Sequence, residues 1–224
     1  MKTYPMRLTI ACLLSAASLT APAAVVYESN PPGQWFTYDA GLISGAYSIM
    51  SSGFTLNSST TVSGAVIGVW NQSGDSLTSV DWRITTQSFG GTELASGTAA
   101  VANQLVANSD GNAYSRASFD LGDSLNLLAG TYWLELGNAL TAQAGATYWD
   151  VILSASGNTM MKDPWSPPYL LTYQVGNEEV PASASFELVD SLSAVPEPSE
   201  WAAMSFGLLG IVWVVKRRFA PARS

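Results

Sequence analysis

Short segments in which apolar and polar residues alternate run through most of this chain, and turn residues separate them about every 8 to 12 positions. For example, Val80, Trp82 and Ile84 alternate with polar residues. Successive side chains of a strand point to opposite faces, so this pattern predicts one buried face and one face in water. Residues 24–194 contain no sustained 3.6-residue period, so we expect no helix longer than a turn or two there.

The same signals predict an all-β domain of about ten strands. We expect a β-sandwich with a jelly-roll-like strand order, and an immunoglobulin-like order is the alternative. A hairpin turn is predicted at Gly90-Gly91, and a polar loop is predicted around residues 108–112. The predicted strand segments are 61–70, 77–87, 92–101, 113–121, 125–136 (with a turn at Ala129-Gly130), 146–155, 169–175 and 182–189.

The N-terminal residues 1–23 have the three parts of a secretory signal peptide. Lys2 and Arg7 precede an apolar segment from Leu8 to about Leu19, and the small residues Ala21-Pro22-Ala23 follow it. We predict cleavage after Ala23, with Ala24 as the alternative position. The chain is therefore expected to be exported.

The C-terminal residues 195–224 form a second targeting signal, also in three parts. Val195-Pro196-Glu197-Pro198 is followed by an uncharged run, Trp201–Val215, and then by a basic tail, 216–224, that begins with Lys216, Arg217 and Arg218. A helix over the apolar run would cover about 22 Å of a hydrocarbon core of about 30 Å, a gap that snorkelling or tilt can close. The basic cluster stays cytoplasmic, so the proline-fixed, extended motif lies across the membrane from it.

This three-part tail resembles the PEP-CTERM sorting signal of Gram-negative bacteria, whose carriers are processed by exosortases. The resemblance covers about the last 30 positions. It implies a transient stay in the inner membrane, cleavage near the motif, and delivery of residues 24–194 to the cell surface or extracellular polymer matrix. An ordinary single-pass anchor that is never cut is the alternative. Residues 127–138 and 146–151 are also similar to β-rich domains found ahead of such tails, which agrees with the predicted fold.

Charge and residue usage exclude several kinds of chemistry in residues 24–194. The segment has three basic residues (Arg83, Arg116 and Lys162) against fifteen acidic ones, a net charge of −12. Such a surface repels nucleic acid and anionic lipid but tolerates neutral polysaccharide and divalent cations. The chain has no histidine, and its one cysteine, Cys12, is lost with the signal peptide. This excludes His-dependent triads, thiol nucleophiles and disulfides.

We expect no catalytic residues, since carboxylates are the main catalytic groups left. A glycosidase needs two carboxyl groups about 5 to 9.5 Å apart. The candidates for such a pair are Asp39, Asp81, Glu135 and Asp150. Acids on the outer face of a strand are usually solvated, so the sequence favours a protein that is not an enzyme.

A calcium ion is the only cofactor that the sequence suggests. Asp110 and Asn112 on one glycine-containing loop, or Asp120 and Asp123 around a second glycine, would offer the oxygen ligands that Ca²⁺ prefers. Neither spacing matches a known calcium loop. Ordinary turn chemistry, in which Asp and Asn bond to their own backbone, is the alternative.

Aromatic residues on proline-containing loops suggest a carbohydrate contact. Trp165 and Tyr169 lie in or just after Pro164–Pro168, and Trp35 follows Pro31-Pro32. A rigidly held aromatic ring offers a flat apolar platform for a sugar ring and loses little entropy on binding. The alternative is that these loops fold back and cover the ends of the domain.

Together these features predict an exported, non-enzymatic surface or matrix protein with a structural or adhesive role in the extracellular polymer layer. A dedicated carbohydrate-binding module is the first alternative, and a carboxylate-dependent glycosidase is the second. Some proteins with this kind of tail are described as ice-binding. An ice-binding surface needs regular ranks of threonine, whereas Thr60-Thr61 and Thr85-Thr86 are isolated pairs, so we do not expect that activity.

Overall fold

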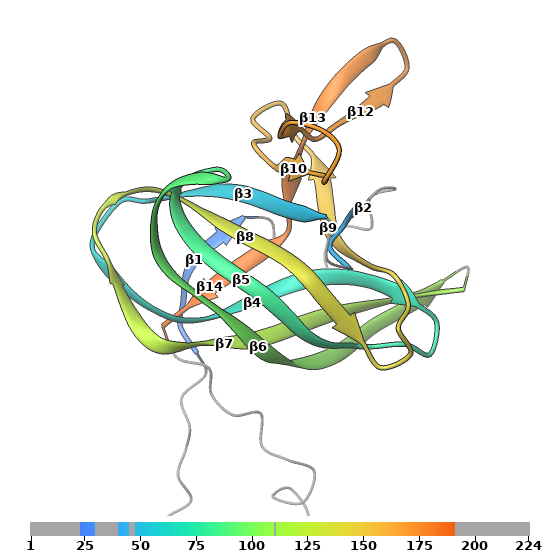
Figure 1. The fold of residues 1–224 in the computed structure, drawn as a ribbon, viewed down its shortest axis with the longest axis horizontal. Coiled ribbons are helices and arrows are strands. Elements are labelled where there is room, and N and C mark those ends of the chain that lie inside the picture. The colour runs from blue at the N-terminus through green and yellow to red at the C-terminus, as the bar shows by residue number, and fades with distance from the viewer. Residues whose placement is uncertain (1–22, 30–39, 45–47, 110, 191–224) are drawn as a thin grey trace, which may run out of the picture. The chain divides into compact units, whose positions relative to one another are not determined.

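The structure is a computed structural model, and it describes residues 23–29, 40–44, 48–109 and 111–190 (Figure 1). The signal-peptide prediction up to residue 22 and the whole sorting tail lie outside the described residues. So do three candidate site residues, Trp35, Asp39 and Asp110.

The all-β prediction is confirmed, because the described residues form fourteen strands and no helix. Accordingly, none of them belongs to a helix long and apolar enough to cross a membrane. The strands are β1 (Val25–Ser29), β2 (Ala40–Leu42), β3 (Ile49–Leu56), β4 (Thr60–Gln72), β5 (Leu77–Gln87), β6 (Gly90–Ser109), β7 (Asn112–Leu127), β8 (Gly130–Thr141), β9 (Thr147–Leu153), β10 (Met160–Lys162), β11 (Tyr169–Leu170), β12 (Thr172–Val175), β13 (Glu178–Ala184) and β14 (Phe186–Val189).

The strands pair antiparallel in one nearly closed sheet, in the order β11-β10-β3-β8-β5-β6-β7-β4-β9-β13-β12. Off this path, β14 pairs with both β1 and β4, and β2 pairs with β9. The sheet has two parts, one around β3, β5 and β8 and one around β4, β7, β9 and β14, and the long strand β6 connects them. Its residues 90–100 pair with β5, and its residues 101–109 pair with β7.

The inward-facing side chains of both parts of the sheet form one hydrophobic core. Its aromatic centre joins strands that are far apart in the sequence. The ring of Phe54 on β3 lies 5.3 Å from that of Tyr27 on β1 and 6.1 Å from that of Phe186 on β14. Phe186 also packs edge-on against Trp149 of β9 at 5.8 Å. Tilted and edge-on pairs of this kind stabilise a core beyond the area that they bury.

The predicted alternation on β5 is confirmed on its inner side and partly wrong on its outer side. Val80, Trp82 and Ile84 are buried in the core, as the pattern indicates. On the outer faces of β5 and β8, however, Thr85 and Glu135 are only 4% and 3% exposed. Phe89 of the β5–β6 turn bonds to Glu135, and Thr85 bonds to Gln87 at the end of β5, so these outer-face residues are not in water as the alternation predicted.

The hairpin between β5 and β6 exists, but its predicted turn residues are wrong. The turn is made by Ser88 and Phe89, and Gly90-Gly91 begins β6. Phe89 has a φ of 52°, which is unusual for a residue with a bulky side chain. Its backbone N–H donates to the Glu135 carboxylate at 2.6 Å, and this contact from another strand explains why the turn is centred there.

Other predicted strands agree with the structure in position, but some are divided differently, since β7 runs through the predicted break after residue 121 and the segments 169–175 and 182–189 each span two strands. The loop expected around residues 108–112 is shorter, because β6 runs to Ser109 and β7 starts at Asn112. Four strands, β1, β2, β3 and β10, were not predicted from the sequence. They are short or rich in small residues, so their alternation is weak.

Candidate functional site

The loop between β10 and β11 presents Trp165 to solvent. The indole side chain is 92% exposed, so it covers none of the core. Two side-chain contacts to Asp163 hold the loop. The Tyr169 hydroxyl donates to one carboxylate oxygen at 2.9 Å, and the Ser48 hydroxyl donates to the other at 3.2 Å. The prediction that Trp165 lies on a constrained, outward-facing loop therefore agrees with the geometry.

Tyr169 contributes to this loop through both its ring and its hydroxyl. It is 40% exposed, and its backbone pairs with Met161 of β10. Partial burial, and then the hydrogen bond and charge of Asp163, raise the pKa of Tyr169 above its ordinary value of 10.0. The phenol therefore stays protonated and keeps donating to Asp163 at neutral pH. Trp35, the third predicted carbohydrate contact, lies outside the described residues.

A pocket of about 270 Å³ opens on the outer face of strands β3, β8 and β5. Two carboxylates, one guanidinium, one side-chain amide and the apolar side chain of Ile49 line it. The lining residues are Ile49, Asp81, Arg83, Glu135, Leu136, Gly137 and Asn138. The strand register explains the grouping, because Ile49, Gly137 and Asp81 are successive cross-strand partners, as are Ser51, Glu135 and Arg83.

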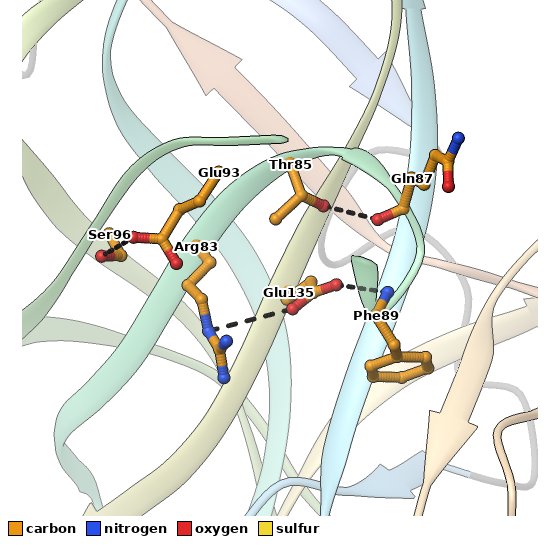
Figure 2. Close-up of polar contacts among 7 residues, drawn as sticks. All are labelled: Arg83, Thr85, Gln87, Phe89, Glu93, Ser96 and Glu135. Carbon is orange, nitrogen blue, oxygen red and sulfur yellow. Dashed lines mark hydrogen bonds and ion pairs between the residues drawn. The ribbon is translucent and has the colours of Figure 1, made fainter. Parts of the chain in front are cut away.

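Glu135 is the buried acid of this pocket (Figure 2). One of its oxygens accepts the Phe89 N–H at 2.6 Å, and the other lies 3.9 Å from the Nε of Arg83. Burial raises the pKa of the Glu135 carboxyl, and the Phe89 hydrogen bond and the charges of Arg83 and Lys162 only partly offset that effect. The Glu135 carboxylate is thus poorly solvated, and its ion pair with Arg83 is long.

Asp81 is fixed at the other side of the pocket by a β-bulge in β8. On β5, Ser79 and Asp81 pair with Leu140 and Gly137, so β8 carries an extra residue between the two pairs. Asn138 lies in this bulge with a φ of 46°, a conformation that asparagine tolerates better than most residues. Its side-chain amide donates to Asp81 at 3.0 Å, and Thr98 donates to the second oxygen of Asp81.

The structure brings together two of the four acids considered for a carboxylate pair, Asp81 and Glu135. Asp150 lies elsewhere, on β9, where it accepts hydrogen bonds from Trp70 at 2.9 Å and from Tyr114 at 3.4 Å. Burial raises the pKa of Asp150 to about 6, and these two hydrogen bonds lower it only in part. Asp39 lies outside the described residues.

The calcium candidates do not converge where they are described. One carboxylate oxygen of Asp120 accepts the Gly122 N–H at 2.8 Å, a turn contact within its own strand. Asp123 and Asn112 are exposed. Across the described ranges, no three acidic, histidine or cysteine residues gather in a way that could hold a metal ion. Ordinary turn chemistry therefore accounts for the described contact of Asp120.

Sequence patterns missed Arg83, Asp163 and Asn138 as site residues. Arg83 and Asp163 are single charged residues in a strand and a loop, and they gain their roles only through partners far away in the sequence. For Asn138 a weak signal exists, since Gly137-Asn138 interrupts an otherwise alternating strand and indicates a bulge.

Comparison with known proteins adds no family to this description. No protein-family model matches the chain. A search of curated proteins finds no significant match either.

Proposed function

We propose that this chain is an exported, non-enzymatic protein that a PEP-CTERM-like tail sorts to the cell surface or extracellular matrix. There the β domain has a structural or adhesive role and contacts neutral polysaccharide. The exposed, tethered Trp165 is the observation that carries the adhesive part of the proposal. The proposed location rests on the tail, which resembles the sorting signal of exosortase substrates. We propose that the tail stays transiently in the inner membrane before an exosortase processes it.

Trp165 suits a sugar contact for three physical reasons. Its indole is almost fully exposed, so both ring faces are open to the apolar face of a pyranose. The loop is held by Asp163 on both sides, through Ser48 and Tyr169, so little further ordering is needed on binding. Finally, the net charge of −12 in residues 24–194 disfavours anionic polymers and leaves neutral ones as partners.

We also propose that the β domain is a β-sandwich with a jelly-roll-like strand order, and an immunoglobulin-like order is the alternative. Supporting it, core aromatics of β3 pack against those of β14 and β1, as two facing layers require. The crossing of β6 from one part of the sheet to the other gives these layers a shared strand.

Trp165→Ala tests the polysaccharide contact. We expect binding to insoluble neutral polysaccharides in a pull-down to fall about tenfold, because stacking on one ring is lost, while thermal unfolding is unchanged. Tyr148→Ala is the matched control, since Tyr148 is 38% exposed on a different strand, β9. If Trp165→Ala unfolds the domain, the residue has a structural role and the proposed contact is wrong.

The alternative functions give different results in the same assays. A dedicated carbohydrate-binding module would bind one glycan saturably and selectively on an array, whereas an adhesive component would bind several polymers weakly. A glycosidase is favoured by one observation, the shared pocket of Asp81 and Glu135. Hydrolysis that disappears in Glu135→Gln would establish that second alternative.

The sorting part of the proposal is tested on the tail itself. Replacing Pro196 and Pro198 by Ala relaxes the extended motif, so we expect the variant to accumulate uncut in the inner membrane fraction of a host with an exosortase. Intact mass and fractionation measure this outcome. Neutralising Lys216, Arg217 and Arg218 should impair orientation instead. Identical mass and location for the wild type and the proline variant would reduce the tail to a plain anchor.

A further inference from the structure

We infer that the outer-face pocket of β3, β8 and β5 binds one residue of a neutral polysaccharide chain as a sugar subsite. This inference deepens the proposed polysaccharide contact and rests on it. It assigns a ligand class to Arg83, which the sequence patterns did not single out, and to Asp81, which they indicated only as a candidate for a carboxylate pair.

The size of the pocket limits the ligand. Its volume of about 270 Å³ is below the roughly 300–1,000 Å³ of sites for drug-sized molecules. Gly137 helps to keep the pocket open, because it has no side chain. A Cβ at this position would lie 3.0 Å from Cγ1 of Ile49 and 3.2 Å from the Ser48 carbonyl oxygen, so any side chain would crowd the neighbouring strand. A single sugar ring is a ligand of the right scale.

Hydrogen-bonding capacity in the pocket is incompletely used. Among the described residues Arg83 has one charged partner, Glu135, and the 3.9 Å separation of their atoms is too long for a hydrogen bond. The Arg83 side chain is 46% exposed, so the N–H donors of its guanidinium can reach a ligand.

The chemistry of the lining favours a neutral polyol. Asp81 and Glu135 accept hydrogen bonds, Arg83 donates them, and Ile49 adds apolar surface. A sugar offers hydroxyls that both donate and accept, together with an apolar C–H face. Two carboxylates disfavour an anionic ligand, and the one guanidinium beside them offsets part of their attraction for a cationic one.

The bulge makes this arrangement rigid. Asn138 and Thr98 each donate to one oxygen of Asp81, so that carboxylate is oriented before any ligand binds. Phe89 does the same for Glu135 through its backbone N–H. Groups held in place in this way lose little entropy on binding, which is what a subsite for a weakly interacting sugar requires.

The pocket is linked to the Trp165 loop through strand β3. Ile49, which lines the pocket, pairs with Lys162 of β10, and the adjacent Ser48 bonds to Asp163. The loop that carries Trp165 therefore starts beside a pocket residue. One polysaccharide chain has two neighbouring places to contact, a ring platform and a polar subsite.

Arg83→Gln tests the subsite in the full-length protein. Isothermal titration uses defined neutral hexasaccharides (glucan, mannan, galactan and xylan types), with a uronate and an amino-sugar hexasaccharide as charged comparisons. We expect the neutral class to bind best and Arg83→Gln to weaken that binding about tenfold, because hydrogen bonds from a charged donor are lost. Arg116→Gln is the matched control, since Arg116 carries the same charge but pairs with Glu187 away from the pocket, and it should change affinity less than about twofold.

The outcomes separate this inference from the proposed function. If Trp165→Ala weakens binding and Arg83→Gln does not, the subsite is overturned and the adhesive contact stands. If Arg83→Gln weakens binding and Trp165→Ala does not, the subsite is supported and the proposed sugar contact of Trp165 is overturned. Tightest binding of a charged hexasaccharide overturns the assignment of a neutral sugar. If no neutral glycan binds the wild type, both proposals fail.

Discussion

Two buried acids of this domain, Asp75 and Glu135, are held in opposite ways. Asp75 lies in the turn between β4 and β5, and its carboxylate accepts the N–H groups of Ser76 and Gln143 at 2.8 and 2.9 Å and that of Gly145 at 3.2 Å. Glu135 accepts one backbone N–H and lies 3.9 Å from the Nε of Arg83, while the charge of Lys162 and the Thr85 hydroxyl add smaller stabilising effects. Both side chains are largely inaccessible to water, so burial alone does not distinguish them.

The pKa directions reflect this difference in partners together with the deeper desolvation of Glu135. Burial acts to raise the pKa of Asp75, but the hydrogen bonds from Thr141 and from three backbone N–H groups lower it below its ordinary value of 3.8. For Glu135 burial prevails and the pKa is raised. A fully bonded acid stabilises the fold, whereas an under-bonded one retains capacity for a ligand. We therefore assign a structural role to Asp75 and a binding role to the Glu135 pocket.

Asp75→Ala should have the largest effect. Three backbone N–H groups in two neighbouring turns would lose a charged acceptor, so we expect a loss of about 3 kcal/mol in the free energy of unfolding, measured in urea. Asp123→Ala, at an exposed position of β7, is the control and should change little. A loss below about 1 kcal/mol would remove the contrast between the two acids, because Asp75 would then contribute no more than a surface residue.

The pH dependence of Asp75 has a definite sign. Its folded pKa is lowered, so its stabilising contribution is present above the unfolded pKa and is lost as the pH falls through the folded one. Acid below about pH 4 should therefore destabilise the wild type more than Asp75→Asn.

Asp150→Asn sharpens the comparison at a higher pH. The folded pKa of Asp150 is raised from 3.8 to about 6, so the folded state binds a proton that the unfolded state does not bind in this range. The wild type should gain about 2 kcal/mol as the pH falls from roughly 7 to 4.5. The variant should lose most of that slope, and the raised pKa values of Glu135 and Glu187 account for the remainder. An unchanged slope would show that Asp150 is not desolvated.

Glu135→Gln should have a small effect on stability, less than about 1 kcal/mol. The amide oxygen still accepts the Phe89 N–H, and the cost of burying a charge disappears while a long ion pair is lost. Chemical unfolding at pH 7 measures the difference. A loss above about 2 kcal/mol would make Glu135 a structural acid like Asp75 and would weaken the case for a ligand pocket.

Removing metal ions or adding reductant should have the smallest effect. Residues 24–194 contain no cysteine, and the acids of both regions are bonded to backbone and side-chain groups of the protein. We expect the melting temperature to stay within about 1 °C in EDTA or in dithiothreitol. A drop of several degrees in EDTA alone would favour the calcium hypothesis.

Much of the secondary structure was predictable because it depends on local patterns. β5 was predicted with the bounds that the structure shows, and β4 and β9 differ by a few residues at their ends. The predictions are wrong where a residue far away in the sequence determines the local backbone conformation. The turn at Ser88-Phe89 is one example, since the Glu135 contact and not the pair of glycines fixes it. The short strand β10 is another, because three residues become a strand only by pairing with β3 and β11.

The sequence by itself determined the all-β class, the absence of histidine, the absence of cysteine from residues 24–194, and the acidic charge of that segment. These follow from composition and from the period of the side chains, which are local properties. Only the tertiary structure decided that Asp81, Arg83 and Glu135 share a pocket while Asp150 does not, and that Asp75 joins two turns. Strand register and a single bulge place those groups, and both depend on pairings between residues far apart in the chain.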